Sequence, residues 1–253
     1  MPGCICGPAL VTRSVAFPAP PRSAIAVGGL EQPRNRFSLH SLDDRSNFGY
    51  VAVMSVARDT IDVRQNILAA AQRIMAAKGF SAVGLNEILV SARVPKGSFY
   101  HYFGSKEAFG EALLAGYFQD YLMDLDATLG EPGLSHAERL MNYWRRWQES
   151  QGNLDCQGKC LAIKLAAEVS DLSEAMRLAL KTGTTGIIER LSHAIEAGVA
   201  EGSVVIEDKP HATAETLYHL WMGASLMAKI LRTPAPFDTA TATTRRILSV
   251  PAH

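Results

Sequence analysis

The chain has 253 residues, of which 25 are Lys or Arg and 25 are Asp or Glu, so its formal net charge is +0. This length suits one small domain joined to a larger one, and the neutral total does not by itself indicate a nucleic-acid partner. No apolar run approaches the roughly 20 residues that a membrane helix needs. The four cysteines do not suit a disulfide framework in a chain this long, and their spacing matches no zinc motif.

Residues 1–57 differ in composition from the rest of the chain. They hold six of the 12 prolines and no lysine, and no helical or strand periodicity persists in them. Such a composition predicts a disordered extension. Two alternatives are open: the native chain starts near Met54 and the preceding stretch is translated upstream sequence, or the stretch is an arm that reaches into a DNA groove.

Two helices are predicted next. The first spans residues 60–78, with apolar residues at helical spacing along one side, and Gly79 ends it. The second spans residues 85–92, and Asn86 lies in its first turn. If the chain turns at Arg93 through a left-handed backbone, the cost relative to glycine is up to about 1 kcal/mol.

Residues 94–106 are the most informative part of the chain. Phe99 and Phe103 are four residues apart, so one face of a short helix can pack inward. The rest of the helix carries basic, hydroxyl and aromatic groups that can bind phosphate oxygens, and Gly97 removes side-chain bulk at the point of closest approach. With Ser105 as the expected N-cap of the next helix, this pattern predicts a helix-turn-helix unit. We expect DNA contacts from Asn86, Lys96, Gly97, Ser98, Tyr100, His101, Tyr102 and Lys106.

The run Lys-Gly-Ser-Phe-Tyr-His-Tyr-Phe-Gly-Ser-Lys-Glu-Ala at residues 96–108 resembles the recognition helix of the TetR family of one-component repressors. The likeness continues upstream to Asn66 and downstream nearly to the end of the chain. Residues 160–176 are similar to the subgroup that contains NemR and AcuR, whose members respond to reactive electrophiles, aldehydes or acrylate-like compounds. The resemblance implies a cytoplasmic bacterial protein that associates with the nucleoid when it is bound to operator DNA.

The fold class expected is all-α, with an N-terminal three-helix DNA-binding domain and a C-terminal helical domain for effector binding and dimerisation. We place the DNA-binding domain at residues 58–106 and the second domain at residues 107–253. Ser135 and Glu138 fit a capping box at the start of one helix. The helices predicted after the recognition helix span residues 105–129, 135–150, 160–169, 171–200, 211–232 and 239–250.

The resemblance also implies a homodimer. The helices around residues 173–200 and 211–232 are expected to form a four-helix bundle with the same helices of a second copy. Small residues would permit close packing there. They are Gly183, Gly186, Gly223, Ala224 and Ser225.

Two sets of residues are candidates for effector sensing. Trp144, Trp147 and Trp221 are either ordinary core residues or the wall of a ligand pocket. Cys156 and Cys160 are four residues apart and would share one face of a helix. Neighbouring lysines favour the reactive thiolate. Two alternatives are open: the thiol is buried and inert, or a small acid or enone binds reversibly and non-covalently in the same core.

The sequence bears on three classes of function. The leading hypothesis is a repressor that binds a pseudo-palindromic operator and is released by an effector. A DNA-binding structural protein of the same fold without an effector is the alternative, and a filled interior would favour it. An enzyme is disfavoured, since the sequence has no nucleophile elbow, phosphate loop or metal motif. We therefore expect no catalytic residue, metal or cofactor and no membrane contact.

Overall fold

The structure is a computed structural model that describes residues 63–151 and 161–251. Every regular element in these residues is a helix, as the sequence predicts, and none of them is long and apolar enough to cross a membrane. The first helix spans residues 63–78. It is followed by α2 (Leu85–Ala92), α3 (Lys96–Tyr102), α4 (Lys106–Leu129), α5 (His136–Gln151), α6 (Leu161–Leu172), α7 (Glu174–Glu201), α8 (Pro210–Leu231) and α9 (Ala235–Ile247).

Local capping sets most of these boundaries, and the caps expected from the sequence are present. Ser105 accepts a hydrogen bond from the backbone N–H of Ala108 at 3.1 Å and starts α4. Ser135 and Glu138 form the capping box at α5: the Glu138 carboxylate accepts the Ser135 N–H at 2.8 Å, and the Ser135 hydroxyl accepts the Glu138 N–H at 3.3 Å.

Several boundaries differ from the sequence prediction, among them the start of α7, which follows its N-cap Ser173 and lies at Glu174 rather than at residue 171. The last helix begins at Ala235 rather than near Thr239, because prolines are tolerated in a first turn, where an N–H has no helical partner. Helix α6 continues to Leu172, three residues beyond the predicted end. Cys156 and Cys160 lie outside the described residues, as do residues 1–62, so the predictions made for them stay predictions.

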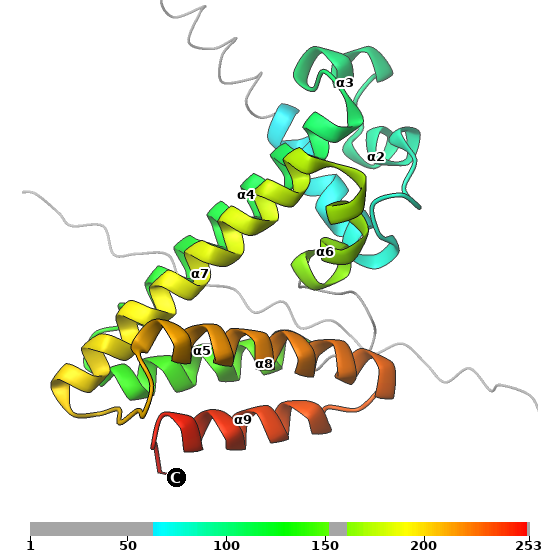
Figure 1. Ribbon diagram of the computed structural model, residues 1–253. Helices are drawn as coiled ribbons and strands as arrows, with labels where there is room; N and C mark the ends of the chain where they lie inside the picture. The colour runs from blue at the N-terminus through cyan, green and yellow to red at the C-terminus, as the bar shows by residue number, and fades with distance from the viewer. Residues whose placement is uncertain (1–62, 152–160, 252–253) are drawn as a thin grey trace, which may run out of the picture. The chain divides into compact units, whose positions relative to one another are not determined.

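The first helix, α2 and α3 form a small unit that we call the head (residues 63–103). The described residues from Lys106 onward form the body. In the body, α4 lies along α7, α5 packs against both, α8 packs on α7, and α9 runs beside α8 (Figure 1). Helix α6 packs against α7 and lies beside the head in the same view.

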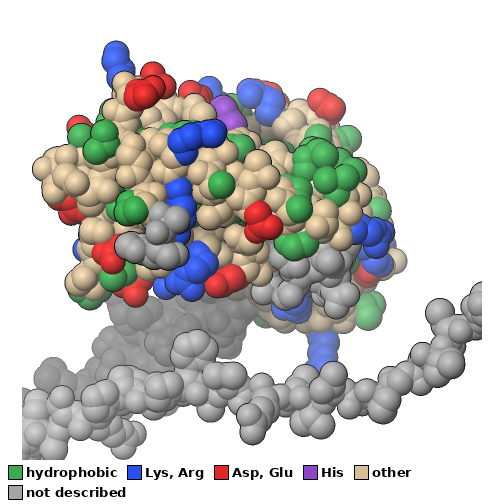
Figure 2. All heavy atoms as spheres, turned by 90° about the horizontal axis from the view of Figure 1, so that it is seen from below, with side chains coloured by type: hydrophobic (Ala, Val, Ile, Leu, Met, Phe, Trp, Pro, Cys, Tyr) green, Lys and Arg blue, Asp and Glu red, His purple; other side chains and the backbone are tan. Residues whose placement is uncertain are grey.

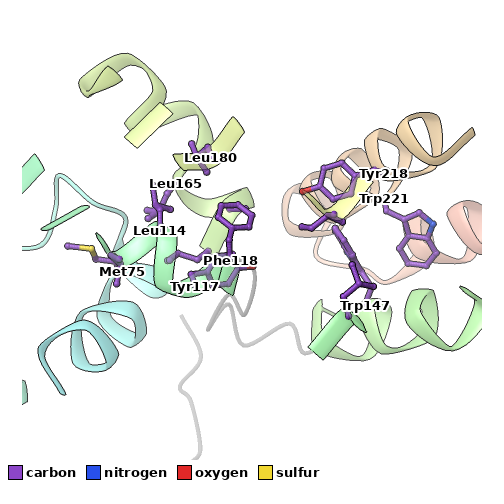
Figure 3. Close-up of a cluster of buried hydrophobic side chains, with 14 of the residues drawn as sticks. Met75, Leu114, Tyr117, Phe118, Trp147, Leu165, Leu180, Tyr218 and Trp221 are labelled. Atoms are coloured by element: carbon purple, nitrogen blue, oxygen red, sulfur yellow. The ribbon is translucent and has the colours of Figure 1, made fainter. Parts of the chain in front are cut away.

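Buried apolar side chains form one hydrophobic cluster, and Figure 3 shows two parts of it. One part, with Met75, Leu114 and Leu165, lies where the head meets α4 and α6; the other, with Trp147 and Trp221, lies between α5 and α8. All five side chains are less than 7% exposed.

Four of the five small residues expected at a dimer contact pack within the chain itself, whereas Gly223 is exposed and a Cβ there would meet no atom within 4 Å. A Cβ at Gly183 would lie 2.1 Å from the Phe118 ring, and one at Gly186 would lie 3.3 Å from Leu122, so both glycines admit side chains of α4 in the same chain. Ala224 and Ser225 are likewise buried within the protomer. The sequence could not distinguish close packing inside one chain from close packing between two.

Candidate DNA-binding surface and body cavities

Helices α2 and α3 meet at a tight turn. Arg93 has φ 57° and ψ 41°, the left-handed conformation expected for this position, and Val94 donates a hydrogen bond to the Leu89 carbonyl at 3.0 Å. The Asn66 side chain of the first helix donates to the Ala92 carbonyl at 2.8 Å. The turn is therefore fixed both by its own backbone and by the first helix.

An aromatic cluster holds the recognition helix α3 in place. Phe99 and Phe103 are 1% and 3% exposed, and their ring centroids lie 5.2 Å and 5.0 Å from that of Phe109 in α4. The Arg64 guanidinium lies 5.3 Å from the Phe103 ring centroid. Since this inner face is anchored, the opposite face of α3 is presented to solvent.

The exposed face of α3 carries most of the residues predicted to contact DNA. Lys96, Gly97 and His101 are exposed, Tyr100 is 59% exposed, and Ser98 and Tyr102 are half-buried, while Asn86 is exposed on α2. A Cβ at Gly97 would meet no atom within 4 Å. The fold itself therefore does not require glycine there. Close approach of an external partner to the helix would account for the missing side chain.

Lys106 is placed differently from the other predicted contacts. Its ammonium donates to the Val83 carbonyl at 3.3 Å and lies 4.9 Å from the Phe80 ring centroid, where the head joins α4. A contact from Lys106 to phosphate would have to share the ammonium with these partners.

The three tryptophans form one buried cluster, but they differ in their surroundings. The Trp144 and Trp221 rings stack with centroids 4.9 Å apart. The indole N–H of Trp147 donates to the Ser225 hydroxyl at 2.9 Å, and that of Trp221 donates to the Thr244 hydroxyl at 2.9 Å. The buried Trp144 Nε1 makes no hydrogen bond.

Two cavities flank this cluster. One, of about 420 Å³, lies between α5 and α9 and is lined in part by Trp144, Arg145 and Arg245. The other, of about 450 Å³, lies between α4 and α5 and is lined in part by Trp147 and Arg146. Both volumes fall in the range of small-molecule sites. Trp144 and Trp147 are thus partly cavity walls, whereas Trp221 is a fully buried core residue.

The sequence prediction missed the polar lining of the cavity between α4 and α5. Tyr121 and Tyr143 share a hydrogen bond of 2.8 Å between their hydroxyl groups, and the Arg146 guanidinium donates to the Thr128 hydroxyl at 2.7 Å. All four residues line this cavity. No sequence signal marks them, since their spacing along α4 and α5 is that of ordinary helix faces.

A helix-turn-helix head joined to a helical body is the architecture of a DNA-binding regulator. The family model for bacterial regulatory proteins of the tetR family matches residues 67–113, and the model for the tetracyclin repressor-like C-terminal domain matches residues 136–244. The chain belongs to the TetR family of transcriptional regulators.

Similar proteins include two named regulators. The HTH-type transcriptional repressor NemR of Escherichia coli is 39% identical over 191 residues, which cover 76% of this chain and 96% of NemR. The transcriptional regulator AcuR of Cereibacter sphaeroides is 34% identical over 191 residues, which cover 74% of this chain and 85% of AcuR. The crystal structure of the reduced form of E. coli NemR matches with a TM-score of 0.72 at 40% identity and covers 76% of this chain and 100% of that one.

Proposed function

We propose that the protein is a homodimeric transcriptional repressor that binds a pseudo-palindromic operator and is released by a small-molecule effector. The observation that carries this proposal is the α3 surface, which is anchored by Phe99 and Phe103 and presents basic and hydroxyl groups around an open Gly97. The DNA-binding domain would span residues 58–106 and the effector and dimerisation domain residues 107–253. The name of NemR, a repressor, supports repression over activation.

An apolar stripe on α8 supports the dimer. Leu226, Met227 and Ile230 are 52%, 43% and 62% exposed, and they follow Gly223 at the spacing of one helix face. The opposite face of α8 is buried within the protomer. A helix that is apolar on both sides needs a second partner, and the same stripe of a second copy is self-complementary about a two-fold axis. We therefore propose that the dimer contact lies on α8 and does not include Gly183 of α7, which packs inside the protomer.

The cavity between α4 and α5 is the proposed effector site. Its two phenols and one guanidinium supply hydrogen-bond donors for a carbonyl or carboxylate oxygen, and Trp147 and Leu125 supply apolar contact. A small acid, aldehyde or acrylate-like compound combines these features. The presence of a cavity beside the tryptophan cluster favours a sensor over a structural DNA-binding protein without an effector.

The DNA-binding proposal is tested by fluorescence anisotropy with the DNA that precedes the protein's own gene. Tyr100→Phe removes an exposed hydroxyl and should weaken binding to all operator variants alike, whereas Tyr218→Phe, which changes a hydroxyl buried in the body outside the proposed effector site, serves as its control. Lys106→Ala should reduce the slope of log K against log salt by about 1 if its ammonium binds a phosphate. Unchanged operator affinity in both Tyr100→Phe and Lys106→Ala would show that α3 does not dock as proposed.

A thiol reaction is the second mode of sensing that the sequence suggests. An electrophile such as N-ethylmaleimide should then release operator DNA from the wild type but not from the Cys156→Ser/Cys160→Ser double variant. If the double variant is still released, sensing is non-covalent and the cavity between α4 and α5 is the site to mutate next.

A further inference from the structure

The turn that ends the first helix binds a carboxylate from the body. Gly79 has φ +93°, and the next two backbone N–H groups both donate to Glu168 of α6: Phe80 N to Oε2 at 3.0 Å and Ser81 N to Oε1 at 2.6 Å. Successive N–H groups after a left-handed residue form a concave anion-binding surface. Here the anion is a side chain of the same protein, from a helix more than 80 residues further along the chain.

The carboxylate and the turn fit each other closely. A Cβ at Gly79 would lie 3.0 Å from Glu168 Oε2, so glycine is required both for the left-handed backbone and for the approach of the carboxylate. Burial acts to raise the pKa of Glu168, but the hydrogen bonds from Ser81 and Phe80 and the nearby Lys164 outweigh it and hold the pKa below its usual 4.5. Glu168 therefore carries a full negative charge at neutral pH.

The side chain of Phe80 is fixed by two further helices of the body. Its ring is 4% exposed, and a Cβ added at Gly110 of α4 would lie 2.9 Å from the ring and 2.2 Å from the Met176 sulfur of α7. The backbone of Phe80 is thus held by α6, and its ring lies where α4 and α7 meet. One residue of the head thus lies where three helices of the body come together.

The links from the head to α4 and to α6 differ in kind. The link to α4 is mainly the apolar aromatic cluster of Phe99, Phe103 and Phe109, with one hydrogen bond from the Lys106 ammonium to the Val83 carbonyl at 3.3 Å. Among the hydrogen bonds of the described residues, the two that Glu168 accepts are the ones that join the head to α6. An apolar cluster tolerates a small rotation, whereas two hydrogen bonds to one carboxylate are directional.

We propose that Glu168 is a positioning residue for DNA binding: it fixes the orientation of the head relative to α6, so that a displacement of α6 turns the recognition helix. In such a movement the head rotates about the aromatic cluster on α4, and the Glu168 carboxylate transmits the displacement of α6 to the head. The DNA readout of this proposal rests on the proposed function.

The test compares Glu168→Gln with Asp126→Asn, each in the full chain. Asp126 of α4 accepts a hydrogen bond from Arg190 of α7 at 2.6 Å, so its amide variant also breaks a carboxylate contact between helices, but inside the body. Operator affinity is measured by anisotropy, global stability by thermal unfolding, and local opening by hydrogen exchange at the Phe80 and Ser81 amides. Glu168→Gln should lower operator affinity at least tenfold and speed exchange at these two amides, with a melting temperature close to that of Asp126→Asn.

Each outcome decides the proposal. Operator affinity within about twofold of the wild type, or wild-type exchange at Phe80 and Ser81, would overturn it. If Glu168→Gln does not fold, Glu168→Asp, which shortens the side chain by one methylene, takes its place with the same readouts. If the wild type binds no DNA, the proposed function fails, and the orientation of the head is then followed by the distance between spin labels on α3 and α6, which Glu168→Gln must broaden.

Discussion

The head and the body differ in what decides their functional surfaces. The candidate DNA-binding surface is drawn from residues 86–106, and even the aromatic cluster that anchors it spans residues 99–109. The cavity between α4 and α5 and the apolar stripe on α8 depend instead on long helices that meet across the chain. Local sequence therefore specifies which side chains the head exposes. Only packing specifies which cavities the body contains and which of its apolar side chains remain exposed.

The body was the region in which the sequence prediction assigned contacts to the wrong partner. Gly183 was expected at a dimer contact and instead admits the Phe118 ring of α4. Conversely, Leu226 and Ile230, which the sequence analysis did not single out, are among the most exposed apolar residues of the described chain. The following predictions test this difference between head and body, from the largest expected effect to the smallest.

The largest effect is expected from a charge placed in the α8 stripe. Ile230→Glu should raise the dissociation constant of the dimer by more than about 100-fold, because an unpaired carboxylate would be buried between two copies. Val205→Glu is the matched control, since Val205 is also 62% exposed but lies outside α8. Light scattering after size exclusion gives the molar mass of both variants. A wild type that is monomeric at micromolar concentration would contradict the assignment of this stripe.

The next effect concerns the packing of α4 on α7. Gly183→Ala should destabilise the protein by about 1–3 kcal/mol, because the new Cβ would overlap the Phe118 ring and the helices must separate. Gly116→Ala makes the same change in the interior of α4, where nothing lies within 4 Å of the added Cβ, and should stabilise by about 0.5–1 kcal/mol through helix propensity. Urea unfolding measures both. Equal effects of the two substitutions would mean that α4 and α7 are not in close contact at Gly183.

The smallest effect is expected where Glu201 at the end of α7 accepts hydrogen bonds from His136 at the start of α5. These bonds should make the stability of the protein depend on pH. Hydrogen bonds from Ser203 and from the backbone and ring of His136 lower the pKa of Glu201 from 4.5 to about 2. Because the folded pKa is the lower one, the stabilisation is fully present above pH 4.5 and is lost as the pH falls towards 2. Glu201→Gln should therefore melt at a lower temperature than the wild type at pH 7, and the difference should shrink below pH 4.5.

A local ion pair supplies the control for that measurement. Glu149→Gln removes the carboxylate that pairs with Arg145 at 3.3 Å, one turn away on α5, and should leave the melting temperature nearly unchanged. If the two glutamate variants melt alike at every pH, the hydrogen bonds of Glu201 add nothing to the packing of α5 on α7.

Most helix boundaries followed from local sequence signals. Ser105, Ser135 and Ser173 each accept a backbone N–H in the first turn of a helix, and Gly79 and Gly202 each adopt a positive φ at a helix end. These interactions join residues at most five positions apart, so they do not depend on the rest of the fold. The starts at Pro210 and Ala235 were less clear, because proline is compatible both with a break and with a first turn.

The sequence by itself determined the helical class, the helix-turn-helix and the face of α3 that carries the candidate DNA contacts, because these depend on spacing, caps and one unusual turn. Tertiary structure decided which tryptophan lines a cavity, which glycines are filled by a neighbouring helix and where Lys106 binds. It also brought Glu168 to the turn at Gly79. A carboxylate more than 80 residues away gives no local signal, and only the packing of α6 beside the head places it within hydrogen-bond distance of two backbone amides.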